Sequence, residues 1–106
     1  MSSTKVNQLQ LLQQNLQNIL LQKQQLEIQF VELESALTEL GTTNKAYKII
    51  GKIMIATNKD ELTNDLTQKK EVVSVRLQNF SKQEEKLKQS IDAVQKEVLE
   101  EMKSKK

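Results

Sequence analysis

The sequence predicts a mainly α-helical protein, a long antiparallel two-helix coiled coil whose helices are joined by one β-hairpin. Apolar residues recur every three or four positions through two long stretches, one on each side of the chain's middle. The ten residues "YKIIGKIMIA" between them resemble two short apolar strands around a glycine. Proline, which would break a helix, is absent, and aromatic residues make up only 3%, so a compact globular core is not expected.

The first helix is expected over residues 5–40, approximately. Its apolar repeat has the average spacing of 3.5 that marks the seam of a left-handed coiled coil. Lys23 is the one polar residue in the repeat, and Gly41 stands where a helix C-cap is expected. The seam positions are Leu9, Leu12, Leu16, Ile19, Lys23, Leu26, Phe30, Leu33, Leu37 and Leu40.

The hairpin is expected over residues 46–57, approximately, after the polar loop "GTTNKA". Gly51 and Lys52 form its two-residue turn, with glycine first as a type II′ turn prefers. This turn places Ile50 opposite Ile53, Ile49 opposite Met54, and Tyr47 opposite Ala56.

The second helix is expected over residues 59–102, approximately. Asn58 and Glu61 have capping-box spacing, and Asp60 adds a negative charge to the first turn. At 1.5 Å per residue each helix is about 50–65 Å long. The seam positions are Leu66, Lys70, Val73, Leu77, Phe80, Glu84, Leu87, Ile91, Val94 and Val98.

The polar seam residues indicate the register of the two helices. If Leu9 lies opposite Val98 and Leu40 opposite Leu66, Lys23 meets Glu84, and this pair is interpreted as a device that fixes the register. A slip of one heptad is the alternative, and it leaves both charges unpaired. A second alternative for Lys23 is that its ammonium simply extends to water, as is expected for Lys70.

The hairpin is predicted to be an oligomerisation element. A lone two-stranded hairpin is marginally stable in water, and an open apolar strand edge invites another strand to pair with it. Hairpins of several subunits are therefore expected to join in an inter-subunit sheet or β-barrel; the alternative is a hairpin folded back on its own helix ends. The residues assigned to this role are Tyr47, Ile49, Ile50, Gly51, Ile53, Met54 and Ile55.

Several function classes are disfavoured by composition. Histidine and cysteine are absent, which removes the common catalytic bases, nucleophiles and transition-metal ligands, so neither an enzyme nor a metal or other cofactor is expected. The net charge is +2 with both signs interspersed, which argues against nucleic acid as a partner. The start "MSSTKVNQLQ" has no apolar signal core, and no apolar run is long enough to cross a membrane.

Three stretches, spread over nearly the whole chain, resemble one known family. They are "LLQKQQLEIQ" in the first helix, "AYKIIGKIMIATNKDEL" from the hairpin into the second helix, and "VRLQNFSKQEEKL" within the second helix. In this order and spacing they are similar to prefoldin beta subunits of the archaeal type. The chain departs from the family pattern in lacking a proline-bearing N-terminal start and an extended C-terminal tail, so its helix ends are expected to be shorter.

The resemblance implies a single prefoldin-like domain over residues 1–106 and a cytoplasmic hetero-hexamer of two alpha-class and four beta-class subunits. It implies an ATP-independent chaperone that captures unfolded proteins at the coiled-coil tips and passes them to a group II chaperonin. A coiled-coil scaffold or tether that oligomerises through its hairpin is the alternative function.

The tips are where client proteins are expected to bind. Apolar residues beyond the needs of a two-helix seam occur at both ends of the chain, and flexible methionine suits promiscuous contact. The candidates are Val6, Leu9, Leu11, Leu12, Val98, Leu99 and Met102. For Leu9, Leu12 and Val98 the alternative is a purely structural role in the seam. Further off-seam residues midway along the first helix, Leu20, Leu21, Ile28 and Val31, are expected only to widen the apolar stripe.

Overall fold

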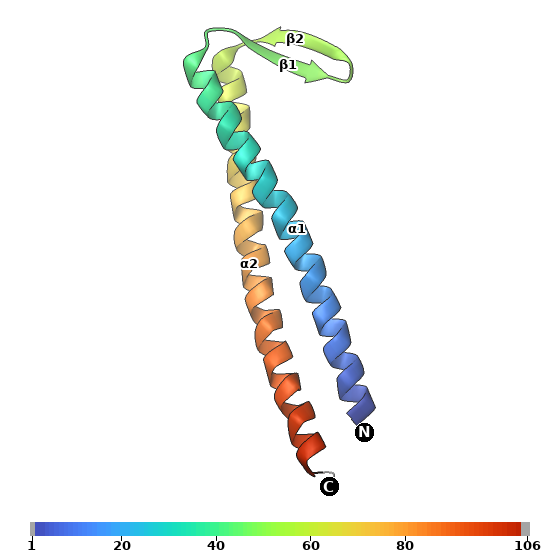
Figure 1. Ribbon diagram of the computed structural model, residues 1–106. Coiled ribbons are helices and arrows are strands. Elements are labelled where there is room, and N and C mark those ends of the chain that lie inside the picture. Colours follow the sequence, from blue (N-terminus) through green and yellow to red (C-terminus); the bar gives the residue numbers. More distant parts are fainter. Residues whose placement is uncertain (1, 105–106) are drawn as a thin grey trace. The chain divides into compact units, whose positions relative to one another are not determined.

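The computed structural model describes residues 2–104 and contains two helices and two strands (Figure 1). Helix α1 spans Ser2–Thr42, strand β1 Ala46–Ile50, strand β2 Ile53–Thr57 and helix α2 Lys59–Ser104. The predicted fold class is therefore confirmed, and α1 extends beyond the predicted bounds at both ends.

The chain forms two compact units. The terminal unit combines Met1–Gln24 with Gln78–Lys106, and the hairpin unit is Gln25–Leu77. In the terminal unit the first part of α1 packs against the second part of α2, with Ile91 and Val94 buried. In the hairpin unit the remaining parts of the helices pack together, and the buried apolar residues are Leu26, Leu40, Ala46 and Val73.

The predicted seam coincides with the protected faces of both helices. Every seam position named above is buried or half-buried in the structure, while most residues between them are exposed. No side chain in the described part of the chain is completely buried, as expected when only two helices share a core. A repeat of 3.5 residues was therefore sufficient to identify the packed face.

The end of α1 differs from the prediction. Gly41 was expected to cap the helix in the left-handed conformation, but the helix continues through it to Thr42, and positive φ is found only at Gly51 among the described residues. At this end of the helix Thr42 Oγ1 donates a hydrogen bond to the carbonyl of Glu39 over 2.8 Å. A side-chain donor thus satisfies a free carbonyl at the end of the helix, which a glycine cap would otherwise do.

The start of α2 is capped as the sequence predicts. The Asn58 side-chain oxygen accepts hydrogen bonds from the backbone amides of Asp60, at 2.8 Å, and Glu61, at 3.4 Å. The carbonyl of Asn58 accepts the first helical bond, from the amide of Leu62. Asn58 is therefore the N-cap residue of α2.

The hairpin has the predicted register and turn. Ile50 pairs with Ile53, Ile49 with Met54, and Tyr47 with Ala56. Gly51 has a φ of 62°, whereas Lys52 does not have positive φ, which is the combination required by a type II′ turn. The strand pairing places alternate side chains on opposite faces of a two-stranded sheet.

Candidate interaction surfaces

The hairpin presents apolar side chains to solvent on both faces. Tyr47, Ile49 and Met54 belong to one face, and Ile50, Ile53 and Ile55 to the other, because side chains alternate along each strand. All six are exposed; even Ile55 retains 45% of its accessible surface, and Ile49 retains 69%. We call this set the hairpin surface.

The hairpin is not folded back on the helices of its own unit. Of its strand residues only Ala46 is buried and only Thr57 half-buried, and both lie at the end of the hairpin that joins the helices. Figure 1 shows the strands leading away from the adjoining helix ends. The fold-back alternative is therefore wrong for this chain, and the hairpin surface together with both strand edges is open.

The second apolar surface lies where the two chain ends meet in the terminal unit. Val6, Leu11, Leu99 and Met102 are exposed, with exposed fractions from 37% for Val6 to 66% for Met102. The neighbouring seam residues Leu9, Leu12 and Val98 are only half-buried. We call these seven residues the tip surface; which of them contact clients stays a prediction.

A lysine joins the two helices at the tip surface. Lys5 Nζ lies 3.2 Å from Glu101 Oε1 and 3.4 Å from Glu97 Oε2, so one ammonium binds two carboxylates one turn apart on α2. The hydrogen bonds to Glu101 and then to Glu97 raise the pKa of Lys5 above its ordinary value. Sequence reasoning missed this contact, although the sequence shows Lys5 near the start of the first helix and two glutamates one turn apart, Glu97 and Glu101, near the end of the second.

Lys23 and Glu84 form the contact expected from the seam. Lys23 Nζ donates to Glu84 Oε1 over 2.9 Å, and Lys88 Nζ binds the other oxygen, Oε2, over 2.8 Å. The Glu84 side chain is only 15% exposed. Hydrogen bonds from Lys88 and then Lys23 lower the pKa of its carboxyl group. The contact excludes the register slipped by one heptad for this unit, and its role in fixing the register stays a prediction.

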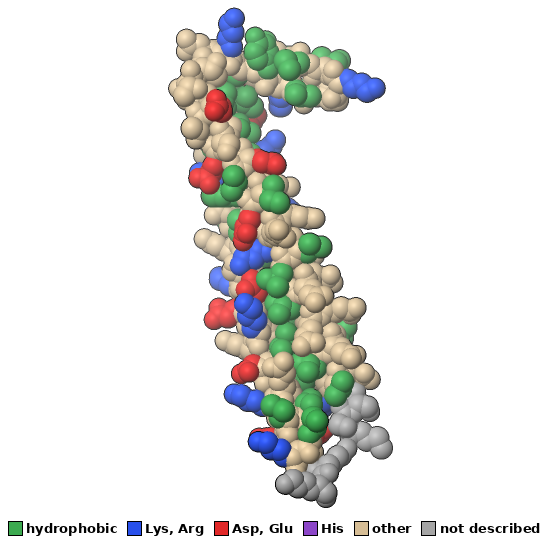
Figure 2. Space-filling model, in the orientation of Figure 1, with side chains coloured by type: hydrophobic (Ala, Val, Ile, Leu, Met, Phe, Trp, Pro, Cys, Tyr) green, Lys and Arg blue, Asp and Glu red, His purple; other side chains and the backbone are tan. Residues whose placement is uncertain are grey.

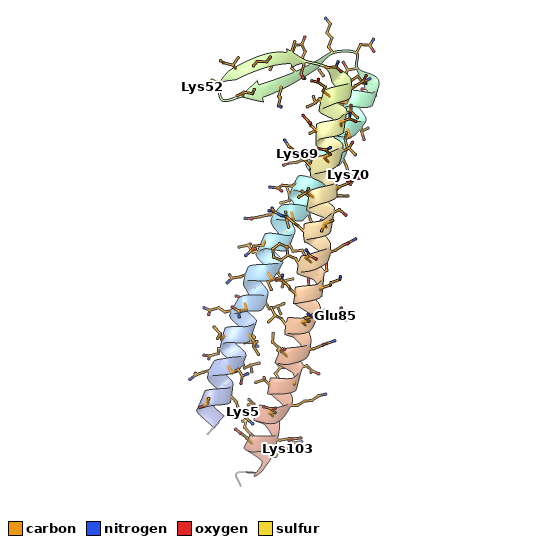
Figure 3. All side chains as sticks on the ribbon, turned by 180° about the vertical axis from the view of Figure 1, so that it is seen from behind. Lys5, Lys52, Lys69, Lys70, Glu85 and Lys103 are labelled. Atoms are coloured by element: carbon orange, nitrogen blue, oxygen red, sulfur yellow. The ribbon has the colours of Figure 1, made fainter. Side chains whose placement is uncertain are left out.

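Lys70, expected to reach water, has two partners in the hairpin unit. Its ammonium lies 5.2 Å from the centre of the Phe30 ring and 3.8 Å from Glu34 Oε2. An ammonium over an aromatic face is attracted by the electron density of the ring. The charge of Lys70 in the seam is therefore stabilised by a cation–π contact with Phe30, the aromatic seam residue of α1. Figure 3 labels Lys70 beside Lys69 on α2.

Two exposed valines on α2 were not identified from the sequence. Val72 and Val75 retain 57% and 56% of their surface. They lie off the seam of the second helix, so the same test that found the exposed residues Leu20, Leu21, Ile28 and Val31 on α1 would have found them. Val72 also lines a groove of the hairpin unit, together with Gln29, Glu32, Leu33, Asp65, Gln68, Lys69 and Val73.

Two negative findings concern residues 2–104 alone. Within this range, no three acidic side chains gather in a group that would hold a metal ion. Neither α1 nor α2, over the same range, is long and apolar enough to cross a membrane.

The arrangement defines a class of protein: a two-helix coiled-coil subunit that presents an open apolar hairpin and an apolar surface at its chain ends. The model of the prefoldin subunit family matches residues 3–105. The chain therefore belongs to the prefoldin subunit family, whose members are chaperone subunits that assemble with one another.

Curated relatives are prefoldin beta subunits of archaea. The chain is 35% identical to that of Caldivirga maquilingensis over 96 residues, covering 88% of this chain and 79% of the relative. It is 38% identical to that of Archaeoglobus fulgidus, covering 79% of this chain and 75% of the relative. The resemblance inferred from the sequence is thus confirmed.

A solved structure has the same fold. The crystal structure of the prefoldin beta subunit from Thermococcus strain KS-1 matches with a TM-score of 0.85 and 29% sequence identity, covering 92% of this chain and 88% of that chain. Two long helices joined by a single antiparallel hairpin are therefore shared by both proteins.

Proposed function

We propose that the chain is a beta-class subunit of an ATP-independent holdase, a chaperone that binds unfolded proteins without folding them. Its clients bind at the tip surface, and its hairpin surface joins it to an alpha-class subunit and to further beta-class subunits. Client transfer to a group II chaperonin and a cytoplasmic location are parts of the same proposal, supported by the family.

The observation that carries the proposal is the exposure of apolar residues at the tip surface. A monomeric protein rarely exposes a cluster of aliphatic side chains unless the cluster binds something. Leu99 and Met102 lie on the last turns of α2, where helices fray, so their surroundings adapt easily to clients of different shape. Adaptable apolar contact suits unfolded chains, which share exposed hydrophobic residues and no common sequence.

The proposal is tested by light scattering from a chemically unfolded client protein that aggregates on dilution, without ATP. The chain is mixed with an alpha-class prefoldin subunit, and assembly is checked in the same sample by size-exclusion chromatography with light scattering. Suppression of aggregation at near-stoichiometric amounts of the assembly is expected. If the assembly forms and aggregation proceeds unchanged, the holdase role fails and a scaffold or tether becomes the better description.

A further inference from the structure

The charged residues of the hairpin and of the loop before it are all lysines. Between Glu39 and Lys59 the sequence contains three lysines, Lys45, Lys48 and Lys52, and no acidic residue. All three lysine side chains are exposed. Figure 3 shows Lys52 at the turn end of the hairpin, and Figure 2 shows hydrophobic side chains along the hairpin with basic ones at its end.

We propose that these lysines make the hairpin selective for a strand that carries carboxylates, supplied by a different subunit, over the hairpin of a second copy of this chain. This inference rests on the proposed function, in which the hairpin is the assembly element, and it adds the chemistry of the partner. Apolar contact and open strand edges would hold any strand, because backbone pairing does not depend on sequence. The lysines supply the discrimination.

The electrostatic reason follows from where Lys48 lies. Lys48 lies on β1, opposite Ile55 of β2, and belongs to the face that contains Ile50 and Ile53. It therefore lies inside any contact made through that face or through the β1 edge. When two copies join hairpin to hairpin, the charges that meet there are lysines. Like charges facing one another across a sheet are destabilising, whereas opposite charges stabilise the pair.

The carboxylates of a second copy do not remove the repulsion between hairpins. The acidic residues nearest in sequence, Glu39, Asp60 and Glu61, are on the helices and not on the strands. Asp60 and Glu61 occupy the first turn of α2, where negative charge complements the helix dipole. A partner strand that itself carries carboxylates is therefore the occupant that fits both the apolar side chains and the charge of the hairpin.

The test uses two variants of the full-length chain. The acidic variant carries Lys45→Glu, Lys48→Glu and Lys52→Glu, and it serves as the probe for a carboxylate-bearing partner. The neutral variant carries Lys45→Gln, Lys48→Gln and Lys52→Gln. A control carries Lys69→Glu, Lys82→Glu and Lys86→Glu, at exposed lysines of α2 for which residues 2–104 contain no ion pair. Circular dichroism establishes that each variant retains its helices.

Association is measured by sedimentation velocity in low and high salt, about 20 mM and about 500 mM NaCl, because screening weakens interactions between exposed charges. Wild type mixed with the acidic variant is expected to associate roughly tenfold more tightly than wild type alone, and salt is expected to reduce this preference. The neutral variant is expected to self-associate more tightly than wild type in low salt and equally in high salt. Wild type mixed with the control variant is expected to show no preference.

Equal association in all mixtures at both salt concentrations would overturn the charge selectivity and leave the hairpin as an assembly element. Preference of wild type for the control variant as strong as for the acidic variant would also overturn it, because net charge and not the hairpin would then be responsible. An absence of association in every mixture, with helices intact, would overturn this inference, whereas the assembly role in the proposed function is judged separately, by assembly with the alpha-class subunit.

Discussion

At the scale of single residues, the contacts of the seam glutamate Glu84 determine how its contribution to stability depends on pH. Its two carboxylate oxygens bind Lys23 on α1 and Lys88 on α2, and its pKa is lowered. A group whose pKa is lower in the folded state contributes stability above its ordinary pKa, and this contribution disappears as the pH falls through the lower folded value. The stabilisation by Glu84 is therefore complete above its ordinary pKa of 4.5 and is lost at more acidic pH.

Glu84→Gln is expected to lower Tm at neutral pH, because a neutral amide loses both charged contacts. The difference from wild type is expected to shrink as the pH falls through the lowered pKa of Glu84, because the wild-type carboxylate then becomes protonated as well. Thermal unfolding followed by circular dichroism measures both values. Glu85→Gln, one position away and exposed, is the matched control. A Tm difference that stays constant over the whole pH range would contradict this explanation.

Lys5 is expected to act on local opening more than on global stability. Lys5→Met retains the length and apolar stem of the side chain but removes the contacts with Glu97 and Glu101. Because exposed ion pairs add little to stability, Tm should change little. Amide hydrogen exchange in the first turns of α1 should become faster, and this is read by mass spectrometry of N-terminal peptides.

The control for Lys5 is Lys82→Met, which changes an exposed helical lysine without an ion pair among residues 2–104. Exchange at the N-terminal peptides should be unaffected in this control. Equal exchange in Lys5→Met and wild type would show that the lysine does not hold the helix ends together.

At the scale of elements, the N-cap of α2 is the clearest local determinant. Asn58→Ala removes the acceptor for the amides of Asp60 and Glu61 and is expected to cost about 0.5–2 kcal/mol in free energy of unfolding. Asn58→Asp retains an acceptor at the same place and should remain near wild type. Urea denaturation measures both variants, and an equal loss in the two would show that the cap does not act through its acceptor.

The two glycines should respond to alanine with opposite signs. Gly41 lies inside the last turn of α1, without positive φ and with open space around it, so Gly41→Ala is expected to stabilise by about 0.5–1 kcal/mol. Gly51 has a φ of 62°, and Gly51→Ala is expected to cost about 1–2 kcal/mol in hairpin stability. Urea denaturation is the measurement for Gly41→Ala. For Gly51→Ala the loss should appear in the hairpin, as faster amide exchange of β1 and β2. Effects of the same sign would contradict the assigned backbone conformations.

At the scale of the whole molecule, the proposed client binding depends on exposed apolar side chains that contribute little to the stability of the fold. A variant with Val6→Ser, Leu11→Ser, Leu99→Ser and Met102→Ser is expected to retain wild-type assembly and to lose most of the suppression of client aggregation. These residues are exposed, so their replacement removes little buried apolar surface and should change Tm only slightly.

The matched control for the tip variant replaces exposed apolar residues elsewhere: Val72→Ser and Val75→Ser on α2. Aggregation followed by light scattering should be suppressed by this control as by wild type. If the control loses activity and the tip variant retains it, the client surface lies in the hairpin unit and the assignment to the tip surface is wrong.

The sequence by itself determined the two helices, their seam, the cap at Asn58, and the hairpin with its turn and register. These features depend on periodicity and on local hydrogen bonding, which are set by residues close in the chain. The family was also evident from the sequence, because three stretches in the right order span nearly the whole chain. The Lys23–Glu84 contact was also predictable, since these are two of the three polar residues that interrupt the seams and they lie opposite one another when the two apolar repeats are aligned.

Only the tertiary structure decided how individual polar side chains are paired and whether the hairpin stays uncovered. Lys5 binds two glutamates and Lys70 faces Phe30, and such choices depend on the rotation and separation of the packed helices, which a heptad pattern leaves open. The open hairpin required coordinates as well, because a pattern of apolar strands does not reveal what covers them.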